Sequence, residues 1–114
     1  MAVEIGSHHA GDVHAAAAEL RDVVGNGVAM AEAVPHAFGL VIAAQGSAWQ
    51  AILGAVNGGN DSDTIAMIAG AIAAAYEPVD SWPPGILDEI ERQNGLDLTA
   101  FAAEFVAAIA SEPV

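Results

Sequence analysis

Cysteine is absent from this 114-residue chain, and basic residues are nearly so. Without cysteine, disulfides and thiolate zinc sites are excluded, and the absence fits a reducing compartment, so we expect a cytoplasmic location. Arg21 and Arg92 oppose fifteen acidic residues, which gives a formal net charge of −13. Because a nucleic-acid backbone is bound through lysine and arginine, nucleic acid is not an expected partner. Cations are the natural counterpart of this charge.

Aromatic residues are also scarce, at 5% of the chain, although hydrophobic residues reach 54%. The apolar content is therefore mostly alanine, valine, isoleucine and leucine. Each small side chain buries little surface, and burial stabilises by only about 25 cal/mol per Å². We expect a small core that depends on a metal or on further protein for part of its stability. At 114 residues, the chain amounts to one domain at most.

Long hydrophobic segments are missing as well. The uncharged run 64–76 is shorter than the roughly 20 residues that a membrane-spanning helix needs, so no membrane is an expected partner. The first residues, MAVEIGSHHAGDV, contain neither a basic nor an apolar region, and they do not resemble a secretory signal. We expect the run 64–76 to form a buried helix.

Helical periodicity recurs along the chain, and no segment of useful length alternates with a period of two. Asp12, Ser47 and Asp97 each precede an apolar stripe and are suited to cap a helix. Pro35 fits the first turn of another helix, and the helix that begins near Asp61 is apolar all round, as expected of a central helix. The predicted fold class is all-α, with about six helices. Their stripes lie within residues 13–24, 35–45, 49–56, 65–76, 86–90 and 98–109.

The stretch NGGNDSDT places Asp61, Asp63 and Thr64 directly before the apolar helix. Carboxylate and hydroxyl oxygens are the ligands that magnesium, manganese and calcium prefer. The same residue types also cap helices, and on local grounds capping is the simpler interpretation. One cap needs one residue, however, whereas polar residues here run from Asn60 to Thr64. The spacing does not match an EF-hand, and a phosphate loop would need a lysine.

A metal at this helix start would meet the positive end of the helix dipole. Two carboxylates cannot offset both that partial charge and a divalent ion, so a metal site here requires further acidic ligands from elsewhere.

Other residues carry weaker signals. His9 and His14 are five positions apart instead of the four that align two ligands on one helix face. The four histidines are therefore interpreted as surface or core-edge residues. The tripeptide Gly25–Asn26–Gly27 is by default a turn that ends a helix.

The segments VGNGVAMAEAVPHAF and AVNGGNDSDTIAMIAGAIAAAY, followed by a Trp-Pro segment, together resemble the C-terminal part of the ADP-ribosylglycohydrolase family. The resemblance covers roughly residues 20–110. It implies an all-α, orthogonal helical bundle of that family's type, of which residues 1–114 would be a single partial domain corresponding to the C-terminal half.

The resemblance also implies a dinuclear Mg²⁺ or Mn²⁺ site with three of its ligands in this chain, and a set of substrate-binding residues beside it. The implied metal ligands are Asp61, Asp63 and Thr64. The implied substrate-binding residues are Gly25, Asn26, Gly27, Gly59 and Asn60, of which the last two belong to the metal loop.

The implied function is metal-assisted hydrolysis of the glycosidic bond between ADP-ribose and a modified protein side chain or small molecule. No general acid or base is identified. Members of the family are longer, and their N-terminal half carries a Thr-Asp-Asp metal motif that this sequence lacks. We therefore expect a fragment, a truncated form or one piece of a split enzyme, completed by a separate N-terminal half or by self-association. The alternative is a non-catalytic acidic helical remnant or binding module of the same fold.

Overall fold

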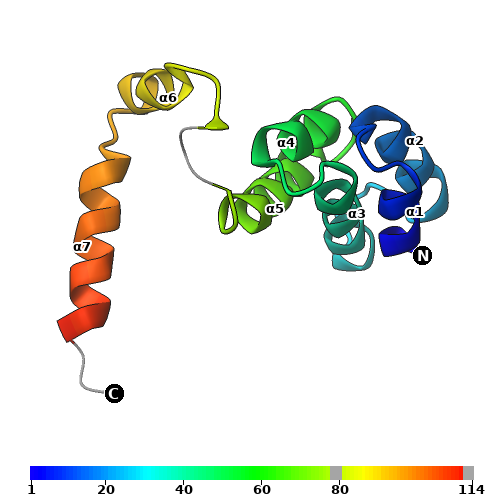
Figure 1. Ribbon diagram of the computed structural model, residues 1–114, viewed down its shortest axis with the longest axis horizontal. Coiled ribbons are helices and arrows are strands. Elements are labelled where there is room, and N and C mark those ends of the chain that lie inside the picture. The colour runs from blue at the N-terminus through cyan, green and yellow to red at the C-terminus, as the bar shows by residue number, and fades with distance from the viewer. Residues whose placement is uncertain (78–80, 112–114) are drawn as a thin grey trace. The chain divides into compact units, whose positions relative to one another are not determined.

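The computed structural model describes residues 1–77 and 81–111, and the structure in these two ranges is helical, with seven α-helices and no strand (Figure 1). The prediction of an all-α fold is confirmed. In chain order the helices are α1 (Ala2–His8), α2 (Val13–Val23), α3 (Met30–Ala43), α4 (Ala48–Val56), α5 (Ser62–Ala74), α6 (Ile86–Asn94) and α7 (Leu98–Ser111).

The chain divides into two compact units, Met1–Trp82 and Pro83–Val114. The first unit contains α1 to α5, and the second contains α6 and α7. The expectation of a single partial domain stays a prediction, and each unit is described by itself.

Three helix starts follow directly from capping residues that the sequence indicates. The Asp12 carboxylate accepts a hydrogen bond from the Ala15 backbone N–H at 3.0 Å at the start of α2. Ser47 serves α4 in the same way, and Asp97 caps the start of α7. These contacts span three residues, so local sequence is sufficient to specify them.

Two helix boundaries differ from the sequence-based expectation. Helix α1 was not expected, because its seven residues hold little periodic signal; it forms because Ile5 and Gly6 are buried against the rest of the unit. Helix α3 begins at Met30, several residues before Pro35. Pro35 is the sixth residue of α3, so it removes one backbone hydrogen bond, to the Ala31 carbonyl, and the helix continues through it to Ala43.

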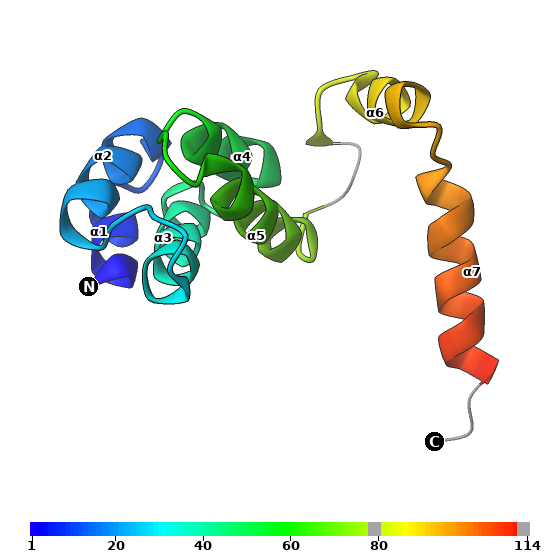
Figure 2. The ribbon, with the colours of Figure 1, turned by 180° about the vertical axis from the view of Figure 1, so that it is seen from behind.

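The core of the first unit consists largely of alanine, with Leu20, Leu40 and Ile65 as its largest fully buried apolar side chains. Glycines let the helices approach closely: a Cβ at Gly70 of α5 would lie 2.9 Å from the Ile52 side chain of α4. Helix α3 lies between α1 on one side and α5 on the other (Figures 1 and 2).

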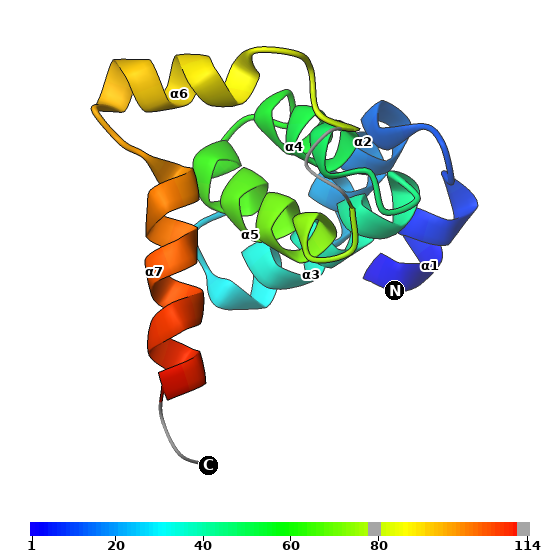
Figure 3. The same ribbon diagram turned by 60° about the vertical axis from the view of Figure 1, so that its left-hand side comes forward.

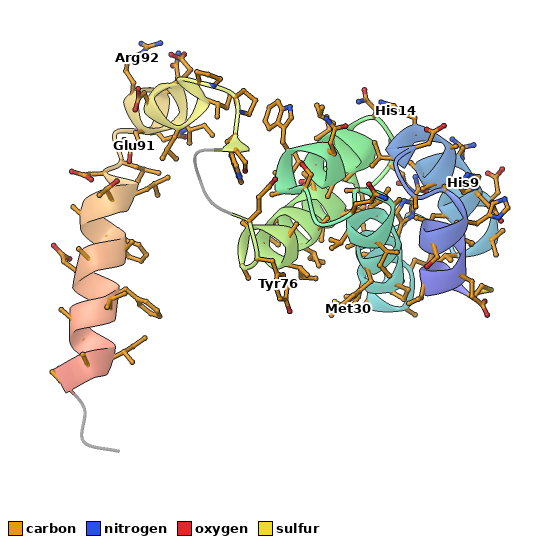
Figure 4. All side chains as sticks on the ribbon, in the orientation of Figure 1. His9, His14, Met30, Tyr76, Glu91 and Arg92 are labelled. Carbon is orange, nitrogen blue, oxygen red and sulfur yellow. The ribbon has the colours of Figure 1, made fainter. Side chains whose placement is uncertain are left out.

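Helix α5 is buried on one face only, and the expectation of a central, fully covered helix is wrong for this structure. It packs against α4 and α3, as the turned view in Figure 3 shows. Met67 is 66% exposed, and Tyr76, just beyond the helix, is 85% exposed and points outward (Figure 4). Within the first unit, α1 and α2 pack with α3 and α4, so the main neighbours of α5 in that unit are α4 and α3 alone.

In the second unit, α6 and α7 are joined at Gly95, which has a positive φ of 64°. The Glu91 carboxylate of α6 accepts a hydrogen bond from the Leu98 N–H at 2.7 Å. No residue of α7 is buried, and its exposed side chains include Phe101, Phe105, Val106 and Ile109. Among the described residues, no helix has both the length and the apolar character required to cross a membrane.

Candidate functional site

The loop between α4 and α5, residues 57–61, turns the chain through two consecutive left-handed residues. Gly59 has a φ of 74° and Asn60 a φ of 55°. Glycine and asparagine are the residue types that adopt this conformation most readily. A Cβ at Gly59 would have no neighbour within 4 Å, so this side of the loop is open. We call residues 57–61 the α5 entry loop.

Asp61 occupies the N-cap position of α5 but does not cap the helix with its side chain. Its Oδ1 accepts a hydrogen bond from the Thr64 hydroxyl at 2.9 Å instead. Asp12, by contrast, accepts a backbone N–H at the start of α2. Capping therefore does not account for the Asp61 carboxylate in this structure, and that was the main alternative to a metal ligand.

The other two predicted ligands lie within the first turn of α5. Asp63 is exposed, and its carboxylate makes no hydrogen bond or ion pair within the part of the chain that the structure describes. Thr64 is partly buried. Each carboxylate lies near the positive end of the helix dipole, which favours its negative charge.

The chemistry of this donor set fits a hard divalent cation, since all three side chains offer oxygen. The number of donors is too small for a complete site. In residues 1–77 and 81–111, no group of three or more His, Cys, Asp or Glu side chains is placed to hold a metal ion. Asp61, Asp63 and Thr64 thus fit one part of a coordination shell whose other ligands come from elsewhere.

The turn at residues 25–27 lies directly against the α5 entry loop, although the two are about thirty positions apart in the sequence. Asn26 is 8% exposed. Its side-chain amide donates to the carbonyl oxygens of Gly58 and Gly59 at 3.1 and 3.2 Å. The Asp61 backbone N–H donates to the Asn26 carbonyl oxygen at 3.2 Å. The structure therefore brings both predicted sets of residues together.

Helix α3 also contacts this turn, through two of its side chains. The Glu32 carboxylate accepts the Gly27 N–H at 2.8 Å, and His36 Nδ1 lies 2.8 Å from the Gly25 carbonyl oxygen. Since a carbonyl only accepts, Nδ1 carries the hydrogen and donates it. Burial lowers the pKa of His36, the hydrogen bond to Gly25 opposes this, and the positive charge of Arg21 adds to the lowering.

Sequence reasoning missed the parts that Glu32 and His36 play. His36 is 1% exposed, so its interpretation as a surface or core-edge histidine is wrong. Neither residue belongs to a recognisable motif, and their partners are defined only by how α3 packs against the turn. Gly25 and Gly27 are partly buried, whereas Gly59 and Asn60 are exposed. Their contact with a substrate stays a prediction.

Comparison of the sequence with known proteins identifies a family and a similar curated protein. A family model described as ADP-ribosylglycohydrolase matches residues 2–113. The uncharacterized protein YegU of Escherichia coli (strain K12) is 34% identical over 94 residues, which cover 82% of this chain. The match covers 28% of YegU, so the chain spans less than a third of that protein's length. No solved structure matches the chain.

Proposed function

This chain belongs to the ADP-ribosylglycohydrolase family, and we propose that it supplies part of the metal site of an ADP-ribosyl glycohydrolase. The reaction is hydrolysis of the glycosidic bond between ADP-ribose and a modified protein side chain or small molecule. The observation that carries the proposal is that the Asp61 side chain makes no capping hydrogen bond, although Asp61 occupies the N-cap position of α5.

Asp61, Asp63 and Thr64 are the residues that would hold Mg²⁺ or Mn²⁺. Bound divalent ions supply positive charge that orients sugar hydroxyls and makes a water molecule a better nucleophile. The Thr64 hydroxyl, by donating to Asp61 Oδ1, limits the rotation of that carboxylate. Helix α5 then fixes the donors on a rigid element, which holds a site more accurately than a loop does.

Substrate contact is proposed for the exposed side of the same loop, at Gly59 and Asn60, and for the adjoining turn at Gly25 and Gly27. The side-chain amide of Asn26 is already occupied by loop carbonyls. A contribution of Asn26 to substrate binding would therefore come from its position in the turn and not from a free amide.

The proposal requires further metal ligands in addition to Asp61, Asp63 and Thr64. Two carboxylates at a helix start bind a divalent ion weakly, because the helix dipole opposes the ion. We propose that the remaining acidic ligands come from the N-terminal half of the family fold, present as a separate chain, or from a second copy of this chain. The open face of α5, where Met67 is exposed, is suited to contact such a partner.

The test is release of ADP-ribose from an ADP-ribosylated protein in the presence of Mg²⁺. The chain alone is expected to give no measurable release, and addition of the N-terminal half of a related enzyme is expected to restore release. The control replaces Asp61 and Asp63 by asparagine in the same mixture. Robust hydrolysis by the chain alone would contradict the requirement for ligands from outside it.

A binding module without catalysis is the second candidate, and the exposed apolar side chains of α7 favour it. The same mixture separates the two functions. Binding of ADP-ribose and metal without turnover would support the module, whereas turnover that depends on Asp61 and Asp63 would support the hydrolase.

A further inference from the structure

The geometry points to Asn26 as a positioning residue that holds the α5 entry loop in the conformation that presents Asp61 and Asp63. The role of the loop in metal binding rests on the proposed function. Whether Asn26 stabilises the conformation of the loop can be measured without a metal. It assigns Asn26 a role different from substrate contact.

Every hydrogen bond of the Asn26 side chain is made to the α5 entry loop. Its two N–H groups are matched by two carbonyl oxygens, of Gly58 at 3.1 Å and Gly59 at 3.2 Å. Its oxygen accepts the Asn60 side-chain amide at 3.3 Å. An asparagine amide has two donor hydrogens and one acceptor oxygen, so every polar atom of this side chain has a partner in the loop.

The backbone of Asn26 adds a direct link to the predicted ligand. The Asn26 carbonyl oxygen accepts the Asp61 N–H at 3.2 Å, immediately before α5 begins. This N–H belongs to the residue whose carboxylate is the proposed ligand. A shift of Asn26 therefore moves the backbone of Asp61 as well as the loop that precedes it.

The turn that carries Asn26 is itself held by α3. Its carbonyl at Gly25 accepts from His36, and its N–H at Gly27 donates to Glu32. Gly25 has a positive φ of 96°, and a Cβ there would lie 2.5 Å from the Glu32 carboxylate, so a larger residue would be strained and would displace the side chain that accepts from Gly27. Helix α3 thus fixes the position of the turn through these hydrogen bonds. Asn26 in turn fixes the position of the α5 entry loop.

No other residue type provides this set of contacts at the same size. Aspartate would place an oxygen where the two loop carbonyls require a donor, and alanine would leave both carbonyls without their side-chain partner. Glutamine would carry the amide one methylene farther from the turn.

The experiment compares the whole chain with its Asn26→Ala variant by amide NMR, first without metal and then during titration with Mn²⁺. Each lost hydrogen bond changes local opening by a factor of about five. We expect the Asp61 amide to exchange with solvent at least about tenfold faster in the variant. Core amides, such as that of Leu40, are expected to exchange as in the parent chain. Paramagnetic broadening at Asp63 and Thr64 is expected to require a higher Mn²⁺ concentration.

Asn57→Ala is the matched control. Asn57 lies in the same loop, but it is exposed and its amide donates to the Leu53 carbonyl oxygen within α4 at 2.8 Å. Its replacement is expected to leave both the Asp61 exchange rate and the Mn²⁺ broadening unchanged. A purely general loss of stability in Asn26→Ala would instead accelerate exchange of the core amides together with Asp61.

Unchanged Asp61 exchange in Asn26→Ala would overturn the positioning role. If the parent chain shows no Mn²⁺ broadening at the start of α5, the proposed metal site fails, and the exchange rates still decide whether Asn26 holds the loop. If Asn26→Ala does not fold, Asn60→Gly replaces it. Glycine tolerates the positive φ at that exposed position, and the variant loses the side-chain bond to Asn26 without adding a charge. An exchange rate for Asp61 equal to that of the parent would then count against the proposal.

Discussion

The paired replacement of Asp61 and Asp63 by asparagine separates metal binding from helix stability. Asparagine keeps the size of each side chain and serves as an N-cap about as well as aspartate does. It removes the negative charge, which is what a divalent ion requires. Because the Asp61 side chain makes no capping bond in the first place, the change is expected to cost only the attraction of the two charges to the helix dipole, about 1 kcal/mol in total.

The expected effect on metal affinity follows from Coulomb's law. Two unit charges 4 Å apart in bulk water attract by about 1 kcal/mol, so a divalent ion gains about 2 kcal/mol from each carboxylate at that distance. Two carboxylates contribute about 4 kcal/mol, which corresponds to a factor of roughly a thousand in affinity. Salt screening and the remaining amide oxygens reduce this, so we expect a loss of at least about tenfold.

The assay is the concentration of free Mn²⁺, measured by electron paramagnetic resonance while the chain is titrated, together with urea unfolding. The control removes two charges elsewhere, by Glu4→Gln combined with Glu19→Gln. Both positions are exposed, at 85% and 44%, and neither belongs to α5 or its entry loop. The control has the same net charge as the test variant, so a difference in affinity between them reports on position.

Equal Mn²⁺ affinity in the two double variants would refute the assignment of Asp61 and Asp63 as ligands. A loss of stability in the Asp61 and Asp63 variant as large as its loss of affinity would show that the carboxylates serve the helix start instead.

Three further predictions concern the support of the site and the exposed helix. Burial lowers the pKa of His36 below its ordinary value of 6.5. Below pH 6.5 the unfolded chain therefore binds more protons than the folded one, and stability falls with decreasing pH until the lowered pKa is passed. Urea unfolding of His36→Gln is expected to show a smaller fall between neutral and acidic pH, and an equal fall would assign it to other groups. Gly25→Ala is expected to destabilise more than Gly59→Ala, because both positions have a positive φ but only at Gly25 would the Cβ meet the Glu32 carboxylate. The Gly59 variant should cost about 1–2 kcal/mol in urea unfolding, and the reverse order would contradict the close approach. Finally, Phe101→Ser should reduce self-association in sedimentation experiments, since this side chain is 67% exposed; unchanged association would place the contact elsewhere.

The fold class and several helix starts follow from local sequence. A capping residue such as Asp12 contacts a backbone N–H three residues later. Residue type and spacing are therefore sufficient to predict the interaction. The start of α3 does not follow in this way. Its N-cap, Ala29, makes no side-chain hydrogen bond, and packing of residues such as Ala33 and Ala37 fixes where the helix lies. Helix α1 likewise depends on contacts with α3 and carries little signal of its own.

For the candidate site, sequence by itself places Asp61, Asp63 and Thr64 within one turn at the start of an apolar helix, because their spacing is local. It does not decide whether the Asp61 carboxylate caps that helix, since the answer depends on the backbone conformation of the preceding loop. Only the tertiary structure brings Asn26 to Gly58, across 32 positions of sequence, and buries His36 beside the same turn. Contacts within a turn of helix are fixed by covalent geometry, whereas contacts between distant segments exist only after α3, α4 and α5 have packed together.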